Sequence, residues 1–310
     1  MWLSIELQWR SIRMRCLHFR LIFAVIAICM VAPLMLSAAP AKEVAIFKGD
    51  EPEKDSIILG GWGSGAAVQS KEMIFEGGWS IKVTTQGLYS GGRIEFGEPV
   101  TLFTDGIDKT RYVQFVLFFN ESQIINPAPG FEYAMSDVEP YRKPKASKVR
   151  FVFVSDKGQT VEAVEPTVAL DQDDNWMRVA VPLEKFKSIP DITEFRMKQL
   201  MIFTDSPGTV FLGLMRMVSD TDPIKVDPLD SRTTSILYTE YFVANAAGGV
   251  SSLNYAWDFD SSDGILAEST ERIAKHTYKT GGDYTVTLTV SDADGIKAPV
   301  TVTTVISVTD

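Results

Sequence analysis

The sequence predicts an all-β protein built from two successive β-sandwiches. Short runs in which apolar and polar residues alternate recur along residues 42–310, and a period of two is typical of strands that bury one face. Gly, Pro and Asp separate these runs and supply turn chemistry. Helical periodicity is expected only for a short turn at Leu183–Phe186. Many short strands with such turns are typical of sandwiches and jelly rolls.

The N-terminal segment, residues 1–41, has the pattern of a secretory signal. Four arginines precede the apolar run 21–36, and Ala39-Pro40-Ala41 offers small residues for cleavage. The apolar run is shorter than the roughly 20 residues that span a bilayer comfortably. We expect cleavage after Ala41 and a mature chain that is secreted or held at the cell surface, without a membrane span. An uncleaved anchor is the alternative.

Composition narrows the function classes. The 310 residues carry a formal net charge of −10, with 45% hydrophobic and 23% charged residues, which is ordinary for a globular protein. An acidic balance argues against nucleic acid as a partner, because a phosphate-binding surface needs a basic patch. Both cysteines, Cys16 and Cys29, lie in the expected signal. The mature chain therefore has no disulfide and no thiol nucleophile, and we expect a monomer.

Residues 42–220 are expected to form the first sandwich. Its predicted strands are Val44–Phe47, Ser56–Leu59, Ser80–Thr84, Arg93–Phe96, Arg111–Phe119, Lys148–Ser155, Thr160–Val164, Trp176–Pro182, Met197–Phe203 and Thr209–Val218. The segment Glu121–Ser147 is longer than a structural loop requires, so it is either a binding insertion or disordered.

The predicted strand Arg111–Phe119 carries aromatic residues on both faces. Phe115 and Phe119 share one face, whereas Tyr112 and Phe118 share the other with Gln114 between them. One face should be core. The second face either carries a sugar platform, on which rings contact pyranose C–H groups and Gln114 orients hydroxyls, or is covered by loops and belongs to the core.

Trp62 is the fourth candidate ligand-binding residue, beside Tyr112, Gln114 and Phe118. It stands in Gly60-Gly61-Trp62-Gly63-Ser64-Gly65, which is so rich in glycine that we expect a loop. A large ring on a mobile loop is either a ligand platform or a plug over the end of the sandwich.

The first sandwich resembles the galactose-binding-like jelly rolls that include many carbohydrate-binding modules. Four stretches carry this resemblance: Gly77–Val83, Trp176–Phe186, Leu200–Phe203 and Gly208–Leu212. The resemblance implies a jelly-roll fold and a polysaccharide or cell-surface glycan as the partner.

Residues 221–234 are expected to be a linker, because they contain two Asp-Pro steps and little hydrophobic surface. Residues 235–310 should form the second sandwich. Tyr255–Phe259 places three aromatic residues on one face of a strand, and Tyr284–Val290 alternates apolar residues with threonine. Asp292–Gly295 supplies a turn before the last predicted strand, Val300–Val305. A buried Trp on one strand and a Tyr opening a later one indicate an immunoglobulin-like sandwich.

The second sandwich resembles the polycystic-kidney-disease (PKD) repeat family of immunoglobulin-like extracellular domains. The motifs are Tyr255-x-Trp257-Asp258-Phe259, His276-Thr277-Tyr278 and the run from Gly282 to Gly295. The resemblance implies a spacer or adhesion module without catalysis.

Catalytic chemistry has few candidate residues in the mature chain, so we expect no catalytic residues. His276 is its single histidine, and the chain contains no Gly-x-Ser-x-Gly for a nucleophilic serine. A pair of carboxylates acting as a glycosidase is the enzyme alternative that the sequence leaves open. We expect no cofactor and no metal. The one alternative is a structural calcium ion, held by Asp171–Asn175 or by Asp258, Asp260 and Asp263.

The sequence thus predicts a secreted, non-catalytic carbohydrate-binding protein, of a kind familiar in bacteria, with a PKD-like module that spaces or presents the binding domain. The alternative is a structural or adhesive cell-surface protein whose first sandwich binds a protein partner.

Overall fold

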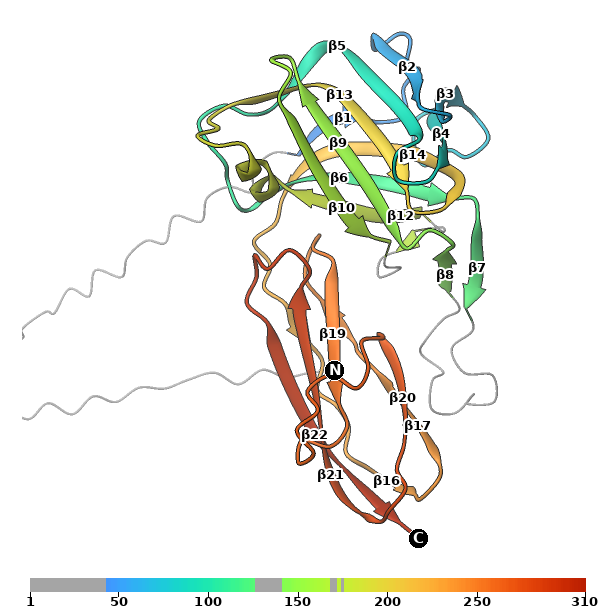
Figure 1. Cartoon of the computed structure of the whole chain (residues 1–310), viewed down its shortest axis with the longest axis vertical. Coiled ribbons are helices and arrows are strands. Elements are labelled where there is room, and N and C mark those ends of the chain that lie inside the picture. Colours follow the sequence, from blue (N-terminus) through green and yellow to red (C-terminus); the bar gives the residue numbers. More distant parts are fainter. Residues whose placement is uncertain (1–42, 126–140, 168–171, 174–175) are drawn as a thin grey trace, which may run out of the picture. The chain divides into compact units, whose positions relative to one another are not determined.

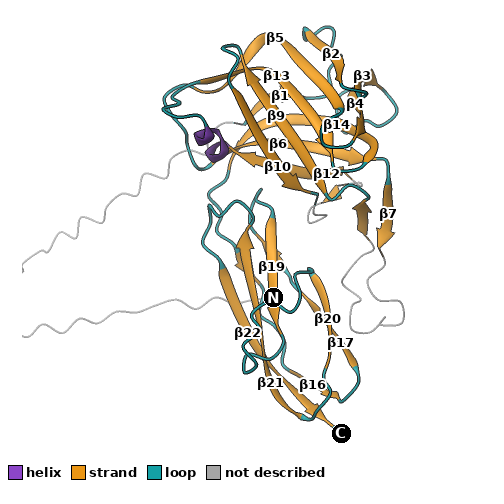
Figure 2. Ribbon diagram, in the orientation of Figure 1, coloured by secondary structure: helices purple, strands orange, loops and turns teal. Residues whose placement is uncertain are grey.

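The computed structural model describes residues 43–125, 141–167, 172–173 and 176–310. The expected signal, residues 1–41, lies outside these residues. Strands dominate the described part of the chain, and within it the single helix is the 3₁₀ turn η1 (Leu183–Ser188) (Figures 1 and 2). The prediction of an all-β protein is confirmed, and the expected helical turn is also present.

The first sandwich contains a seven-stranded sheet with the order β11–β12–β6–β14–β4–β3, in which β1 also pairs with β14. Its strands are β1 (Val44–Phe47), β3 (Ala66–Ser70), β4 (Ser80–Gln86), β6 (Arg111–Phe119), β11 (Gln172–Asp173), β12 (Trp176–Pro182) and β14 (Pro207–Ser219).

A five-stranded antiparallel sheet forms the other layer, with the order β10–β9–β13–β5–β2. Its strands are β2 (Ile57–Trp62), β5 (Gly91–Phe103), β9 (Lys148–Ser155), β10 (Thr160–Pro166) and β13 (Phe195–Thr204). Strands β9 and β13 cross in front of β6 and β14 in Figure 1, which therefore presents the outer face of this sheet.

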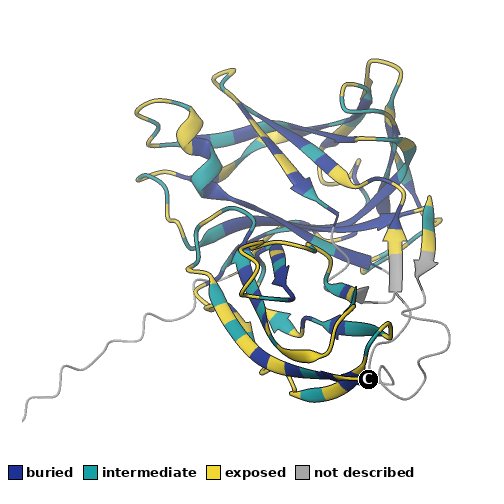
Figure 3. Cartoon of the chain, turned by 60° about the horizontal axis from the view of Figure 1, so that its bottom comes forward, coloured by how far each residue is buried: buried dark blue, intermediate teal, exposed yellow. Residues whose placement is uncertain are grey.

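The main core lies between these two sheets. Alternate residues of each strand point into it, so that Phe115 of β6 stacks on Phe151 of β9 with ring centroids 4.1 Å apart. Phe186 of η1 closes one part of the core against Phe153 and Phe195. In Figure 3 dark blue segments are found mainly on strands, and the connecting loops are mostly yellow or teal.

The second sandwich has a four-stranded sheet, β16–β22–β21–β19, and smaller two-stranded pairs. The strands of the sheet are β16 (Arg232–Ser235), β19 (Leu253–Asp258), β21 (Gly282–Asp292) and β22 (Val300–Thr309). The pairs join β17 (Thr239–Val243) to β20 (Ile273–Thr277), and β15 (Lys225–Val226) to β18 (Ala246–Ala247). Trp257 is buried between Phe242 and Phe259.

The boundaries of the second sandwich involve part of the predicted linker. Ile224 is buried in the second core, and Val226 and Leu229 pack against it. The division into residues 42–220, 221–234 and 235–310 stays a prediction.

Most predicted strands are present, and the differences occur where glycine or a hairpin decides the path. Trp62 is the last residue of β2 and pairs with Gly91, so the predicted loop at Gly60–Trp62 is wrong. Gly61 permits this path because a Cβ there would lie 2.2 Å from the carbonyl oxygen of Gly65. The sequence also did not predict β3, or the hairpin of β7 (Ser122–Ile125) and β8 (Tyr141–Pro144).

Candidate functional site

The structure places three of the four predicted ligand-binding residues on one strand and the fourth on another sheet. Tyr112, Gln114 and Phe118 lie on the outer face of β6, with exposed fractions of 0%, 2% and 7%. Trp62 lies at the edge of the five-stranded sheet and is 50% exposed. The four residues therefore do not share one surface.

Phe118 is covered by a second, smaller apolar cluster. Its ring lies 5.7 Å from that of Trp176 and 6.2 Å from that of Phe211. The segment between β3 and β4 closes this cluster with Phe75, whose ring packs edge-on against Trp176 at 5.5 Å. Gly213 makes the close approach feasible, since a Cβ there would lie 2.4 Å from Phe75. Phe118 thus behaves as a core residue.

Gln114 and Tyr112 have polar partners within the chain. The side-chain carbonyl oxygen of Gln114 accepts a hydrogen bond from Nε of Arg216 at 2.8 Å, and Arg216 pairs with Glu43 at 3.0 Å. The hydroxyl of Tyr112 lies 3.3 Å from the hydroxyl of Ser251. Burial raises the pKa of Tyr112 to about 12. Neither side chain is turned toward solvent.

The outer face of the five-stranded sheet carries exposed aromatic rings. Trp62 ends β2, and Tyr89, which is 77% exposed, stands in the loop between β4 and β5. The two backbones are close, because a Cβ on Gly63 would lie 3.3 Å from the carbonyl oxygen of Tyr89. Tyr89 was not predicted from the sequence, because it sits in a short turn without strand periodicity.

A row of planar polar side chains lies beside these rings on the same face. Arg93 and Glu95 of β5 alternate with the buried Ile94 and Phe96, so their side chains point outward. Gln199 of β13 pairs in register with Glu95, and its amide nitrogen lies 3.4 Å from the carboxylate. The alternation of apolar and polar residues in β5 could have predicted from the sequence that Arg93 and Glu95 point outward.

Arg93 occupies an open position in the row. Its neighbour on β2 is Gly60, which has no side chain to cover the guanidinium. Within the described ranges, no carboxylate lies within ion-pair distance of Arg93. A guanidinium with five N–H donors in a fixed plane can therefore bind vicinal hydroxyls.

Arg150 of β9 anchors the aromatic edge of this face. Its guanidinium lies between two rings, 5.0 Å from the centroid of Phe203 and 5.3 Å from that of Tyr89. Nη1 donates to the carbonyl oxygen of Leu88 at 2.9 Å, and Nη2 pairs with Glu162 at 2.7 Å. These contacts tie the loop that carries Tyr89 to the sheet.

A groove of about 470 Å³ runs between β2 and β3, next to this face. Ile58 and Val68 at its rim are more than half exposed, while Ile57 and Ala67 form its floor. Since β2 and β3 are edge strands of different sheets, the groove marks an open side of the sandwich.

The other residues singled out in the sequence have structural contacts. His276 stacks on Phe259 at 4.5 Å and meets Tyr278 edge-on at 4.6 Å. Burial lowers the pKa of His276. The carboxylates of Asp258, Asp260 and Asp263 accept hydrogen bonds from backbone N–H groups two residues further on. The Asp171–Asn175 cluster lies outside the residues whose side chains the structure describes.

Within the described residues, no group of three or more His, Cys, Asp or Glu side chains is placed to hold a metal ion. A helix with the length and apolar character of a membrane span is likewise missing from the described part of the chain.

Comparison with known proteins supports the class of the second sandwich. Residues 228–308 match the family model described as PKD domain, which confirms the resemblance drawn from its motifs. No curated protein matches the chain.

Among solved structures, the chain is similar to carbohydrate-binding module β-sandwiches, the class that the first sandwich was predicted to resemble. One comes from work on such modules of the β-sandwich superfamily, with 13% identity over 56% of this chain and 62% of that one, and a TM-score of 0.33. The match thus spans less than two thirds of that structure's own length.

Two further structures belong to family 22 carbohydrate-binding modules. The C-terminal module of Clostridium thermocellum Xyn10B is 12% identical over 52% of this chain and 84% of that one, with a TM-score of 0.25. A structure described as a xylan-binding domain is 11% identical over 59% of this chain and 96% of that one, with a TM-score of 0.28.

Proposed function

We propose that the first sandwich binds a carbohydrate chain on the outer face of its five-stranded sheet, and that the PKD domain spaces or presents it. The observation that carries this proposal is the combination of exposed rings, Trp62 and Tyr89, with the polar row of Arg93, Glu95 and Gln199. Rings offer apolar planes to sugar C–H groups, and the polar side chains offer donors and acceptors to hydroxyls.

In this proposal the protein is secreted or held at the cell surface and does not catalyse a reaction. One pair of acids on this face is too far apart for glycosidase chemistry. Glu95 and Glu162 stand on β5 and β10, which are three strand spacings apart in the sheet order. That separation is about 14 Å, whereas the two carboxylates of a glycosidase stand about 5–9.5 Å apart.

A glycan array and polysaccharide retention with the full chain test this function. Trp62→Ala and Arg93→Ala should each weaken binding by roughly tenfold, which corresponds to about 1–1.5 kcal/mol. Neither change should lower the melting temperature, because both side chains are on the surface. Tyr238→Ala is the matched control, because Tyr238 is 45% exposed on the second sandwich. Unaltered binding by both variants, or a wild type that no glycan retains, would overturn the proposal.

The second candidate function is adhesion to a protein partner. It is favoured by one observation, the apolar groove between β2 and β3 with Ile58 and Val68 at its rim. A protein partner would make binding sensitive to Ile58→Asp and Val68→Asp, and insensitive to Arg93→Ala.

A further inference from the structure

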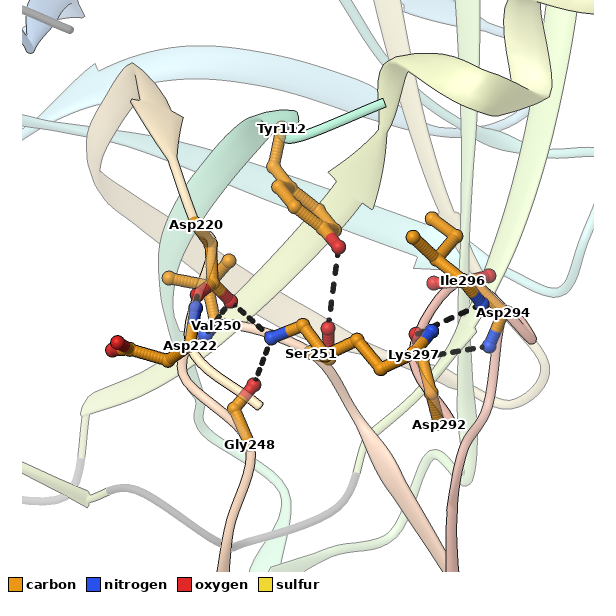
Figure 4. A network of polar contacts seen from close by, with 10 residues as sticks. All are labelled: Tyr112, Asp220, Asp222, Gly248, Val250, Ser251, Asp292, Asp294, Ile296 and Lys297. Atoms are coloured by element: carbon orange, nitrogen blue, oxygen red, sulfur yellow. Dashed lines mark hydrogen bonds and ion pairs between the residues drawn. The ribbon is translucent and has the colours of Figure 1, made fainter. Parts of the chain in front are cut away.

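Residues 40–310 form one compact unit, and polar groups of the two sandwiches meet within it. Two segments of the second sandwich, residues 248–252 and 292–297, contact β6, η1, the end of β14 and Asp220 in the first. Figure 4 shows most of this network, with Tyr112 and Asp220 on one side and Ser251, Asp292 and Lys297 on the other.

Lys297 makes the first bridge. Its ammonium group lies 2.5 Å from Oδ2 of Asp220, which directly follows β14, and the two side chains are 9% and 3% exposed. The same carboxylate accepts a hydrogen bond from the backbone N–H of Val250 at 2.7 Å. The backbone N–H of Lys297 donates to Asp292, which fixes its loop. This buried ion pair is therefore supported by charge-assisted hydrogen bonds from the neighbouring backbone.

Lys185 makes the second bridge, in which the lysine belongs to the first sandwich. It stands on η1 of the first sandwich and contacts two carboxylates, Asp294 of the second sandwich at 2.8 Å and Glu165 of β10 at 3.0 Å. The side chain of Glu165 is 1% exposed and that of Asp294 is 7% exposed. One ammonium group therefore serves two buried carboxylates.

Apolar contact accompanies the two bridges. Val250 and Ile296 of the second sandwich pack against Tyr112, Ala180 and Val218 of the first. The Tyr112–Ser251 contact lies beside this cluster. The junction thus combines buried apolar surface with ion pairs.

The charges around Glu165 do not balance. Lys185 on η1 attracts its carboxylate, while Asp292 at the end of β21 and Asp294 in the turn after it repel it. On the strands packed against β10, Arg150 pairs with Glu162, Lys148 is exposed, and Arg178 has a contact of its own. Burial and, after it, the nearby Asp294 raise the pKa of Glu165 to about 7. Asp294 and Asp292 belong to the second sandwich, so docking itself contributes to this rise.

We propose that the two lysine bridges hold the second sandwich against the first, and that this junction weakens when Glu165 ionises, because its carboxylate then repels Asp294 of the second sandwich. A carboxyl group whose pKa is higher in the docked state stabilises docking in acid, and this stabilisation is lost as the pH rises through about 7. The junction is therefore tighter in mildly acidic than in alkaline solution.

Hydrogen–deuterium exchange of the full chain tests this inference, with rates corrected for the intrinsic effect of pH. Peptides covering residues 246–252 and 292–298 should exchange up to about tenfold faster at pH 8 than at pH 6. Glu165→Gln keeps the shape of the side chain without the ionisation, so its exchange should not change with pH. Lys185→Met and Lys297→Met should each speed exchange at pH 6.

Lys187→Met is the matched control, because Lys187 lies on the same η1 turn and pairs only with Glu184 within the described residues. Its exchange should equal that of the wild type. Peptides of β21 report whether each variant is folded, and Glu165→Gln carries the test if a lysine variant unfolds. A pH response that survives Glu165→Gln, or lysine variants that exchange like the wild type, would overturn the inference.

Discussion

The two outer faces of the first sandwich have similar side chains and opposite environments. Tyr112, Gln114 and Phe118 on the seven-stranded sheet are covered by the β3–β4 segment and by loops of the PKD domain. On the five-stranded sheet Trp62 is 50% exposed and Arg93 and Gln199 are partly exposed, although Val152, Met201 and Phe203 of the same face are buried. An aromatic residue next to an amide on a strand therefore indicates a binding face only when no other segment packs over it.

The largest expected effect separates two aromatic residues, Phe118 and Tyr89. Phe118→Ala should lower the free energy of unfolding by about 3–5 kcal/mol, because it empties a site packed by Trp176 and Phe211. Tyr89→Ala should change it by no more than about 1 kcal/mol, since the ring is exposed and its loss removes only the contact with Arg150. Urea unfolding of both variants measures the difference. Equal values for the two variants would mean that the faces do not differ.

Two glutamines give the next, smaller contrast. Gln114→Ala leaves Nε of the half-buried Arg216 without its acceptor, which should cost about 1–3 kcal/mol of stability. Gln199→Ala on the open face should leave stability unchanged and weaken glycan binding by a few fold, which is about 1 kcal/mol. Thermal melts and binding titrations of both variants check this contrast. If the Gln114→Ala variant melts normally and loses glycan affinity, the glycan binds on the outer face of β6 instead.

Local sequence patterns predicted much of the fold. Alternation gave β1, β6, β9 and β12 with the bounds that the structure shows, because period two reports which side chains a strand buries. The motifs around Trp257 and Tyr284 gave the PKD domain, which the family model confirms. Each of these signals lies within a few residues of the element it predicts.

The candidate site could be predicted only in part, because the segments that cover a strand face lie far from that strand in the sequence. Phe75 lies more than forty residues before Phe118, and Ser251 more than a hundred after Tyr112. Their contacts cannot be read from strand periodicity. Trp62 was predicted as a candidate site residue, although its backbone was expected in a loop. The glycines that suggested a loop instead permit β2 to lie close to the residues that follow it.

The smallest expected effect concerns the anchor of the open face. Arg150→Lys keeps the positive charge near Glu162 but removes the planar group between Tyr89 and Phe203 and its bond to the carbonyl oxygen of Leu88. A guanidinium between two rings stabilises their arrangement by about 0.5–1 kcal/mol per ring at partly exposed sites. We therefore expect faster exchange of residues 87–90 and a few-fold loss of glycan affinity.

Arg196→Lys is the control for this change, because Arg196 of β13 forms a surface ion pair with Asp156 at 3.1 Å and contacts no ring in the described part of the chain. The control should retain wild-type affinity and loop exchange. Loss of affinity by Arg150→Lys without faster loop exchange would mean that Arg150 contacts the ligand itself. Faster exchange without loss of affinity would show that Tyr89 does not take part in binding, and the open face would then act through Trp62 and the polar row alone.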